Sequence, residues 1–259
     1  MVNYKLTYFD GRGVAETARQ IFALADQKFE DNRLTREAFA EPYHSVRSLC
    51  SKLMASSWHN RWLSIATWPR HSIFALADQK FEDNRLTREA FAEVKPTLPF
   101  GQVPVLEVDG KQLAQSLAIN RYLAKTFGFA GKDDFEAALI DSLGDQYSDY
   151  RAEMKTYYYA AHGFMPGDPE KLKTEVLFPA RDKFLNFITK FLKNNASHGY
   201  LIGDKISWVD VLIAEHMADM SRTVPGFLDQ FPEVKEHMNK VQEHPKIKKW
   251  IESRPQTSF

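Results

Sequence analysis

The sequence predicts an α/β domain followed by an all-helical domain, and three observations support this prediction. The chain has 259 residues, a length that suits two domains better than one. Up to about residue 131, short β-rich runs alternate with helical patterns in the order strand, helix, strand, strand, strand, helix. From Asp133 onward, only helical periodicity is found. We therefore place the two domains at residues 1–131 and 132–259.

The first strand and helix are predicted at the very start of the chain. Tyr4–Phe9 is a short run rich in β-forming residues, which predicts a strand. A tight turn with two glycines follows it. Apolar residues then recur at helical spacing from Val14 to Ala25, which predicts a helix.

The first domain ends with a predicted hairpin and a helix. Residues 103–108 and 111–113 predict two antiparallel strands, because the Asp109-Gly110 pair between them favours a tight hairpin turn. Gln115 and Ser116 then begin a helix with regularly spaced apolar residues.

An exact internal repeat complicates this domain. Residues 21–41 and 73–93 both read IFALADQKFEDNRLTREAFAE, at an offset of 73 − 21 = 52. A solenoid needs at least three stacked repeats, so we interpret the repeat as one duplicated piece, with an insertion at about 42–93. Either residues 28–34 or residues 80–86 could supply the second strand, and the sequence does not choose between them.

The segment between the two copies, residues 42–72, has an unusual composition. It contains no Asp or Glu, it holds the only cysteine, Cys50, and it has three tryptophans without regular spacing, Trp58, Trp62 and Trp68. We interpret it as a loosely packed excursion. The functional alternative is a basic, aromatic segment that binds RNA or a partner protein.

The second domain is predicted to be built from helices alone. Residues 135–161 predict one long helix, and residues 172–194 predict another with a kink at Pro179. Ser207 and Asp210 have the spacing of a capping box at the start of a strongly apolar helix. Two short helices are predicted at 232–243 and 245–253.

Charge and composition exclude several classes of function. Lys+Arg and Asp+Glu both number 34, so we expect neither nucleic acid nor a membrane surface as a partner. The N-terminus lacks a signal-peptide pattern, and a single cysteine excludes an internal disulfide; both features favour a cytoplasmic protein. Gly11-Arg12-Gly13 only superficially suggests a dinucleotide site, because Glu16 stands where a third glycine is needed. The histidines show no metal-ligand spacing supported by cysteine, so no metal is expected.

Several strings together resemble one enzyme family. These are YKLTYFDGRGVAE, TLPFGQVPVLEVDG, QSLAINRYLAK and SWVDV, followed by the ending WIESRPQTSF. In this order they resemble the cytosolic glutathione transferases, and the ending is typical of the sigma class, which includes prostaglandin D synthase-like members. The resemblance covers residues 1–41 and 94–259. It implies a thioredoxin-like N-terminal domain, an all-helical C-terminal domain, a homodimer, and a detoxifying enzyme that conjugates glutathione to hydrophobic electrophiles. Glutathione would be the co-substrate, with no permanently bound cofactor.

Within this resemblance, Tyr8 is the catalytic residue. Glutathione brings its own thiol, and a free thiol with a pKa of about 8.5 is mostly protonated at neutral pH, so the enzyme must stabilise the thiolate. The Tyr8 hydroxyl, at the end of the first strand, would donate a hydrogen bond to the sulfur. A tyrosine at a strand end more commonly only packs, so this assignment depends on the family motif around it.

The other glutathione-binding residues are assigned by matching the family's motifs. A helix N-terminus suits the γ-glutamyl carboxylate, because free amides and a positive dipole end attract an anion. The matched residues are Phe91 (or its twin Phe39), Lys95 and Gln102 for the glycine end, Val103 before the family's cis-proline for the cysteine moiety, Gln115 and Ser116 for the γ-glutamyl carboxylate, and Asp145 for the amino group across the dimer interface.

Three departures from the family pattern bear on the reaction. Val14 stands where many sigma members have an arginine that supports the thiolate, and Phe91 stands where the family has a tryptophan. Ala152 matches a tryptophan of the prostaglandin-isomerising members. These residues leave conjugation plausible and make a dedicated prostaglandin isomerase less so.

The electrophile pocket is assigned to Phe9, Tyr147 and Tyr150, together with the C-terminal end of the chain. The alternative from another class is a folded protein that binds glutathione or an apolar ligand without catalysis, because the repeat inactivates it. Residues 42–93 lie beside the Phe91 and Lys95 side of the predicted site, which motivates this alternative.

Overall fold

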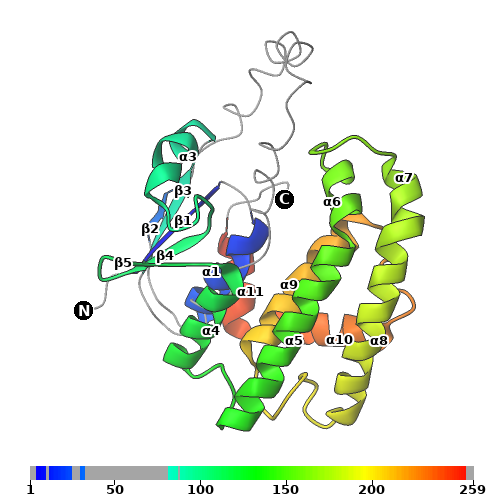
Figure 1. The fold of residues 1–259 in the computed structure, drawn as a ribbon. Coiled ribbons are helices and arrows are strands. Elements are labelled where there is room, and N and C mark those ends of the chain that lie inside the picture. Colours follow the sequence, from blue (N-terminus) through cyan, green and yellow to red (C-terminus); the bar gives the residue numbers. More distant parts are fainter. Residues whose placement is uncertain (1–3, 10–11, 25–29, 33–80, 87, 255–259) are drawn as a thin grey trace.

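A five-stranded sheet forms the centre of the first domain. The computed structural model describes residues 4–9, 12–24, 30–32, 81–86 and 88–254. The order across the sheet is β2-β3-β1-β4-β5, and Figure 1 shows the sheet beside a group of helices. The strands are β1 (Tyr4–Phe9), β2 (Glu30–Asn32), β3 (Phe81–Leu86), β4 (Val105–Val108) and β5 (Lys111–Ala114).

Both copies of the repeat contribute a strand, which answers the choice that the sequence left open. β3, from the second copy, runs parallel to β1 over its whole length, with Tyr4 opposite Phe81 and Phe9 opposite Leu86. β2, from the first copy, pairs parallel with β3 at the edge of the sheet. Glu30 lies opposite Glu82, so each residue of β2 pairs with its own counterpart 52 positions later.

The hairpin and the last helix of this domain match the prediction, whereas α3 and η3, between β3 and β4, were not predicted. β4 pairs antiparallel with both β1 and β5. Asp109 and Gly110 both have positive φ, 47° and 77°, as a type I′ hairpin turn requires. The helical elements are η1 (Gly13–Ala15), α1 (Glu16–Leu24), α3 (Arg88–Val94), η3 (Lys95–Thr97) and α4 (Ser116–Phe127).

From residue 134 onward, the described chain is helical. α9 lies among the other helices, contacting α5 and α10 within the domain and α1 and α4 of the first domain. Every residue of α9 from Trp208 to Met217 is buried, as expected for a helix that is covered on all sides. The helices are α5 (Asp134–Glu153), α6 (Lys155–Ala161), α7 (Pro169–Leu172), α8 (Phe178–Asn194), α9 (Trp208–Thr223), α10 (Pro232–Gln242) and α11 (Pro245–Ser253).

The predicted single helix over residues 135–161 is wrong, because it is interrupted at Met154. Met154 has φ −83° and ψ 0° and separates α5 from α6. Its side chain is fully buried, and the Arg151 guanidinium lies 3.3 Å from its sulfur. Neither proline nor glycine stands near this position, so the sequence carries no breaker signal there.

The predicted kink at Pro179 takes the form of a π-helical turn. Residues Lys173–Leu177 form this turn between α7 and α8, and Pro179 lies in the first turn of α8. Proline has no N–H and clashes with the preceding turn, which accounts for the widened backbone before it. The helical run begins earlier than predicted, at Pro169, because the Asp168 carboxylate accepts hydrogen bonds from the amides of Glu170 and Lys171.

The predicted capping box at the start of α9 is confirmed. Asp210, fully buried, accepts from the Ser207 backbone amide at 2.8 Å and from its hydroxyl at 2.6 Å. The Leu201 amide donates to the same carboxylate at 2.8 Å, and His237 Nε2 lies 2.8 Å from it. One side chain thus joins the start of α9 to the preceding loop and to α10.

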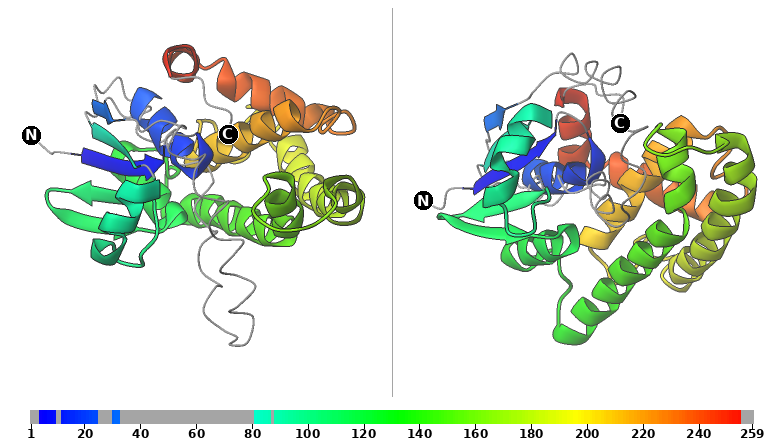
Figure 2. Two further views of the ribbon diagram at one scale, coloured as in Figure 1. Left: turned by 90° about the horizontal axis from the view of Figure 1, so that it is seen from above. Right: turned by 45° about the horizontal axis from the view of Figure 1, so that its top comes forward.

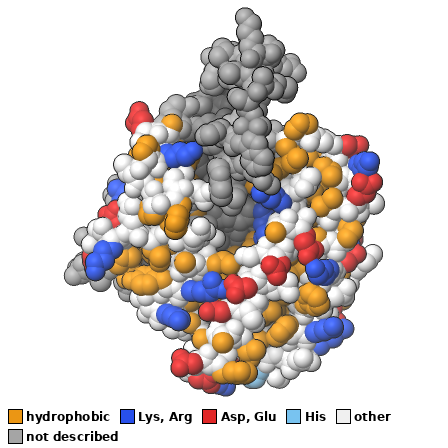
Figure 3. All heavy atoms as spheres, viewed as in Figure 1, with side chains coloured by type: hydrophobic (Ala, Val, Ile, Leu, Met, Phe, Trp, Pro, Cys, Tyr) orange, Lys and Arg blue, Asp and Glu red, His pale blue; other side chains and the backbone are white. Residues whose placement is uncertain are grey.

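The two domains meet along α1, which packs against α11 and α9, while α4 also contacts α9. Figure 1 shows α1 and α11 side by side between the sheet and the helices. Charged side chains of both signs are mixed with apolar ones over the face in Figure 3. Within the described ranges, the model has no helix whose length and apolar character would allow it to span a bilayer.

Candidate active site

The candidate active site lies at the edge of the sheet where β1 ends. Tyr8 is only 1% exposed. The turn into α1 passes directly over its ring: a Cβ built on Gly13 would lie 2.5 Å from the Tyr8 hydroxyl oxygen and 3.0 Å from Cε1. Gly13 also has φ +36°, which side chains rarely adopt. Gly13 therefore allows the backbone to approach the tyrosine hydroxyl closely.

Replacing Gly13 with alanine is expected to displace the Tyr8 hydroxyl. The added methyl collides with that oxygen and also strains the backbone, so we expect catalytic efficiency to fall by about tenfold or more. Gly110→Ala is the matched control: its φ is +77°, but nothing lies within 4 Å of the added Cβ. The control should lose about 1 kcal/mol of stability and keep its activity. Steady-state kinetics and thermal unfolding of both variants check this, and equal losses of activity would contradict the role of contact with Tyr8.

The segment before β4 reaches the same edge of the sheet. The Val103–Pro104 bond is cis, and both residues are buried. In the antiparallel register, Thr7 lies opposite Val105. Continuing that register by two residues brings Val103 level with Phe9, next to Tyr8.

The start of α4 arrives at this edge from β5. Ala114 lies opposite Val105, and Gln115 follows it with φ 72° and ψ 120°, an uncommon conformation for a residue other than glycine. Gln115 is exposed and Ser116 is half-buried. Among the described residues, no side chain caps the first turn of α4. The amides and positive dipole end of α4 therefore suit an anionic group.

The residues matched to the glycine end lie between β3 and β4. Phe91, on α3, is half-buried and packs against the core. Lys95 begins η3 and is half-buried, and its side chain runs along Gly101, 3.5 Å from the position of a Cβ there. Gln102 is half-buried directly before Val103. Because β3 runs parallel to β1, this connection leaves the sheet at the edge where Tyr8 lies.

Asp145 has a different setting. It lies on α5 with its side chain 69% exposed, and its carboxylate pairs with Arg121 of α4. The Arg121 Nε also lies 3.2 Å from Asp141. Asp145 thus joins α4 to α5 while its carboxylate faces solvent.

The residues assigned to the electrophile pocket are buried in the helical domain. Tyr150 is 2% exposed, its ring stacks on Phe184 at 4.6 Å, and its hydroxyl lies 3.2 Å from His216 Nε2. Tyr147 lies 5.3 Å from the His216 ring, and burial raises the pKa values of both tyrosines. These positions favour packing between α5, α8 and α9 over lining an open pocket. The side chain of Phe9 lies outside the described residues.

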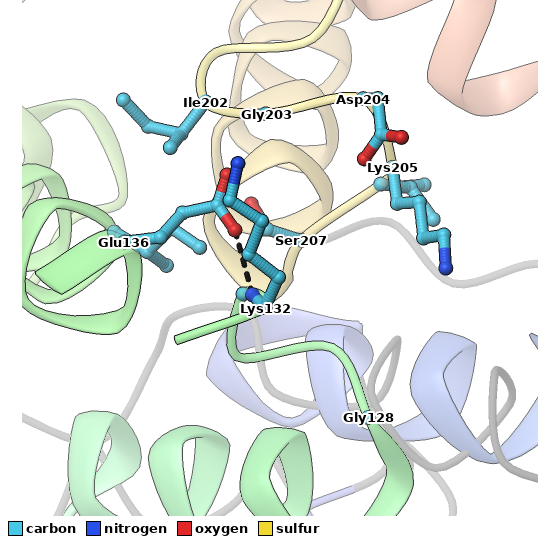
Figure 4. A pocket seen from close by; sticks show the side chains of 11 residues that line it. Gly128, Lys132, Glu136, Ile202, Gly203, Asp204, Lys205 and Ser207 are labelled. Carbon is cyan, nitrogen blue, oxygen red and sulfur yellow. Dashed lines mark hydrogen bonds between the residues drawn. The ribbon is translucent and has the colours of Figure 1, made fainter. Parts of the chain in front are cut away.

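A pocket of about 280 Å³ lies elsewhere, between the start of α5 and the loop before α9. Figure 4 shows the Glu136 carboxylate accepting from the Lys132 backbone amide at 2.6 Å within it. Ile140, Ile202 and Ile206 contribute apolar walls. None of the site residues predicted from the sequence lines this pocket.

A buried group of charged residues lies next to the site and was not predicted from the sequence. Glu16, at the start of α1, and Glu215, on α9, are 1% and 4% exposed, and both contact Arg254. No local motif signals this cluster, because its members are separated by up to 238 positions in the chain.

The chain belongs to the glutathione S-transferase family. Residues 149–254 match the family model of the glutathione S-transferase C-terminal domain, and residues 70–125 match that of the N-terminal domain. The N-terminal match includes the second copy of the repeat, the copy that lies beside β1. The protein is therefore a transferase with a thioredoxin-like domain and a helical domain.

Individual relatives match over full length. Probable glutathione S-transferase 5 of Caenorhabditis elegans is 43% identical, with 100% of both chains covered. The solved structure of NaGST1 is 52% identical, with a TM-score of 0.78 and 100% of both chains covered. A structure described as a Nu-class GST from Haemonchus contortus is 40% identical over 100% of both chains, with a TM-score of 0.74. Because these matches span the whole chain, they do not by themselves mark residues 42–93 as an insertion.

Proposed function

We propose that this protein conjugates the thiol of glutathione to electrophilic small molecules, with Tyr8 stabilising the thiolate. The observation that carries the proposal is the position of the Tyr8 hydroxyl. It lies against Gly13 at the sheet edge where the approach to β4 and the start of α4 also arrive. A hydroxyl placed there can donate to a sulfur whose tripeptide is held by the surrounding backbone.

Glutathione would lie across this sheet edge, with its γ-glutamyl carboxylate and its glycine carboxylate at opposite ends of the site. Its γ-glutamyl carboxylate would meet the uncapped start of α4 at Gln115 and Ser116. Its cysteine backbone would pair with Val103, and its glycine carboxylate would lie near Lys95. Gln102 and Phe91 complete that end of the proposed site.

The proposed reaction is a nucleophilic substitution or addition. The thiol gives up its proton to water, the resulting thiolate accepts a hydrogen bond from Tyr8, and the sulfur then bonds to the electrophilic carbon. In a substitution, the leaving group departs with the electron pair of the broken bond, and in an addition, the electron pair of the attacked double bond takes up a proton from water. The hydrogen bond favours the ionised thiol, which is the nucleophilic form at neutral pH.

Conjugation in a detoxifying role is favoured over prostaglandin isomerisation, because Ala152 replaces a tryptophan of the isomerising members and is exposed on α5. The sigma class stays a prediction, since a Nu-class relative is also similar over the full chain. A cytoplasmic location also stays a prediction.

A homodimer is proposed as the active form. The exposed Asp145 carboxylate and the 62% exposed Phe100 ring, directly before Gly101, are available to a second copy of the chain. Light scattering of the purified protein measures the mass, and a monomer would remove Asp145 from the proposed glutathione site.

The first test is the rate at which the purified full-length protein conjugates glutathione to a generic aryl halide. We expect a rate well above the uncatalysed background from a soluble sample. A background rate would overturn the proposal for this chain and favour the non-catalytic binding protein.

Removing one repeat unit tests whether the repeat limits the enzyme. Deleting residues 42–93 or residues 21–72 yields the same shortened chain, because the two copies are identical. Since β1 already pairs with β3 and β4 in the full protein, we expect kcat within about threefold of the full chain. Kinetics at matched concentrations of folded protein check this, and a large rise would support the inactivated-binder alternative.

A further inference from the structure

The start of α1 is held by side chains of the helical domain. Glu16 is the first residue of α1 and is 1% exposed. Its Oε1 accepts from the Trp250 indole N–H of α11 at 2.8 Å and from the Arg254 guanidinium. Two residues near the C-terminus therefore converge on one buried carboxylate beside the proposed active site.

The same guanidinium contacts a second buried carboxylate. Arg254 Nη1 donates to Glu215 Oε1 of α9 at 3.1 Å, and Glu215 Oε2 accepts from Gln20 of α1 at 2.5 Å. Arg254 is 8% exposed and lies between Glu16 of the first domain and Glu215 of the second. The Arg254 guanidinium thus bridges two carboxylates that belong to different domains.

The backbone of α1 and α9, together with one ion pair, connects this cluster to Tyr8. Arg12 Nη2 lies 3.6 Å from Asp219, which is one turn after Glu215 on α9. Gly13 follows Arg12 and lies against the Tyr8 hydroxyl. Displacement of the start of α1 would therefore displace the backbone that contacts the proposed catalytic group.

We propose that Arg254 is a positioning residue for Tyr8: by bridging Glu16 and Glu215, it holds the start of α1, and with it Gly13, in place over the tyrosine. The proposal rests on the proposed role of Tyr8 in glutathione conjugation. The proposal gives Arg254, a residue near the C-terminus, a role in positioning Tyr8 of the first domain.

The charges of the cluster predict how the enzyme behaves without Arg254. Within the part of the chain that the structure describes, further charged groups near the two carboxylates include Arg19 of α1, 3.5 Å from Glu16, and Arg12 with its partner Asp219. Burial raises the pKa of Glu215, and Arg254 opposes that rise. Burial also disfavours the charged form of Arg254, but attraction by both glutamates outweighs it and raises the guanidinium pKa.

Arg254→Met is expected to make the start of α1 sensitive to pH. Without the cation, the two buried glutamates repel, and one of them binds a proton with a pKa raised above that of an exposed glutamate, about 4.3. A raised pKa gives stability that is present at low pH and is lost as the pH rises through it. We expect kcat relative to the unaltered protein to fall about twofold near pH 6 and about tenfold near pH 8, with KM for glutathione changed less than twofold.

Three further variants test whether repulsion between Glu16 and Glu215 causes the pH-dependent loss of kcat. Arg254→Met combined with Glu215→Gln removes one of the repelling charges and should restore a nearly pH-independent ratio. Arg254→Lys keeps the charge on a shorter side chain that reaches less far than Nη1, the atom that contacts both carboxylates, and should lie between the methionine variant and the unaltered protein. Lys248→Met is the matched control, because it removes a cation of α11 whose partner Glu243 is exposed. It should behave as the unaltered protein does.

Hydrogen exchange of residues 12–24 gives a readout that does not need activity. Faster exchange in Arg254→Met at pH 8 than at pH 6, and its reversal in the double variant, are expected. A folded Arg254→Met protein with an unchanged pH profile and unchanged exchange would overturn the proposal. If Arg254→Met does not fold, Arg254→Lys serves as the test instead. An unchanged pH profile of kcat in Arg254→Lys would also overturn the proposal. An inactive unaltered protein would instead overturn the proposed function, while the exchange data would still test the anchoring of α1.

Discussion

Tyr8→Phe is expected to lower kcat/KM for glutathione conjugation by roughly 10- to 100-fold at neutral pH. The substitution removes only the hydroxyl, and a hydrogen bond to a charged group contributes about 1.5–3 kcal/mol. The pKa of the bound thiol should rise toward that of a free thiol, about 8.5, so the loss should shrink as the pH increases. Steady-state rates and the ultraviolet absorbance of the bound thiolate, both followed against pH, measure the effect.

The matched control is Tyr4→Phe, on the same strand and the same face as Tyr8. Tyr4 is 6% exposed, and its ring contacts Phe127 of α4 edge to face at 6.1 Å, a contact that phenylalanine can keep. The control should retain its activity and its thiol pKa. Equal effects of the two substitutions would show that Tyr8 acts through packing, and an unchanged thiol pKa in Tyr8→Phe would remove its proposed role.

Asp210→Ala is expected to destabilise the protein by about 3–5 kcal/mol, the largest effect on stability of the changes considered. The fully buried carboxylate accepts from the Leu201 and Ser207 amides and the Ser207 hydroxyl, and it contacts His237. Alanine leaves these buried groups without their acceptor, and each unsatisfied donor costs about 1–3 kcal/mol, with partial relief from relaxation. Chemical denaturation of the variant, followed by circular dichroism, gives the change in unfolding free energy.

Asp210→Asn removes the negative charge of the side chain while keeping its shape, so it separates the two contributions to stability. The amide keeps one acceptor oxygen but places a donor against the Ser207 group, so an intermediate loss of about 1–3 kcal/mol is expected. Glu136 offers a comparison, since it is an acidic residue near the start of α5 that is only half-buried. Its replacement by alanine should cost less than that of Asp210, and a larger cost would contradict the importance assigned to the α9 cap.

Local signals in the sequence were sufficient to predict β1, α1, the β4–β5 hairpin, α4 and the start of α9. Strand periodicity, the Asp109-Gly110 turn and the capping box at Asp210 are local signals, and each appears where predicted. The interruption at Met154 was missed because it depends on how that buried side chain packs beside Arg151. A contact of this kind leaves no mark in a periodic pattern.

The site could be predicted only in part for the same physical reason. The assignment of Tyr8 depends on the motif around it and stays a prediction, as does the assignment of Tyr147 and Tyr150 to the electrophile pocket, both of which are buried in the helical domain. Arg254 was not found at all, since its partners come from helices far apart in the sequence. Buried ion pairs between domains are a property of the assembled fold.

The pairing of β2 with β3 places a second strand from the same repeated sequence at the edge of the sheet. The two repeat copies have the same sequence, so the sequence allows either of them to pair with β1. In either case, the chain must accommodate the 52-residue offset between the copies. The second copy continues from β3 into α3 and is followed by η3. The exact repeat thus supplies two neighbouring strands of this sheet from one sequence, with the second copy beside β1 and the first copy at the edge.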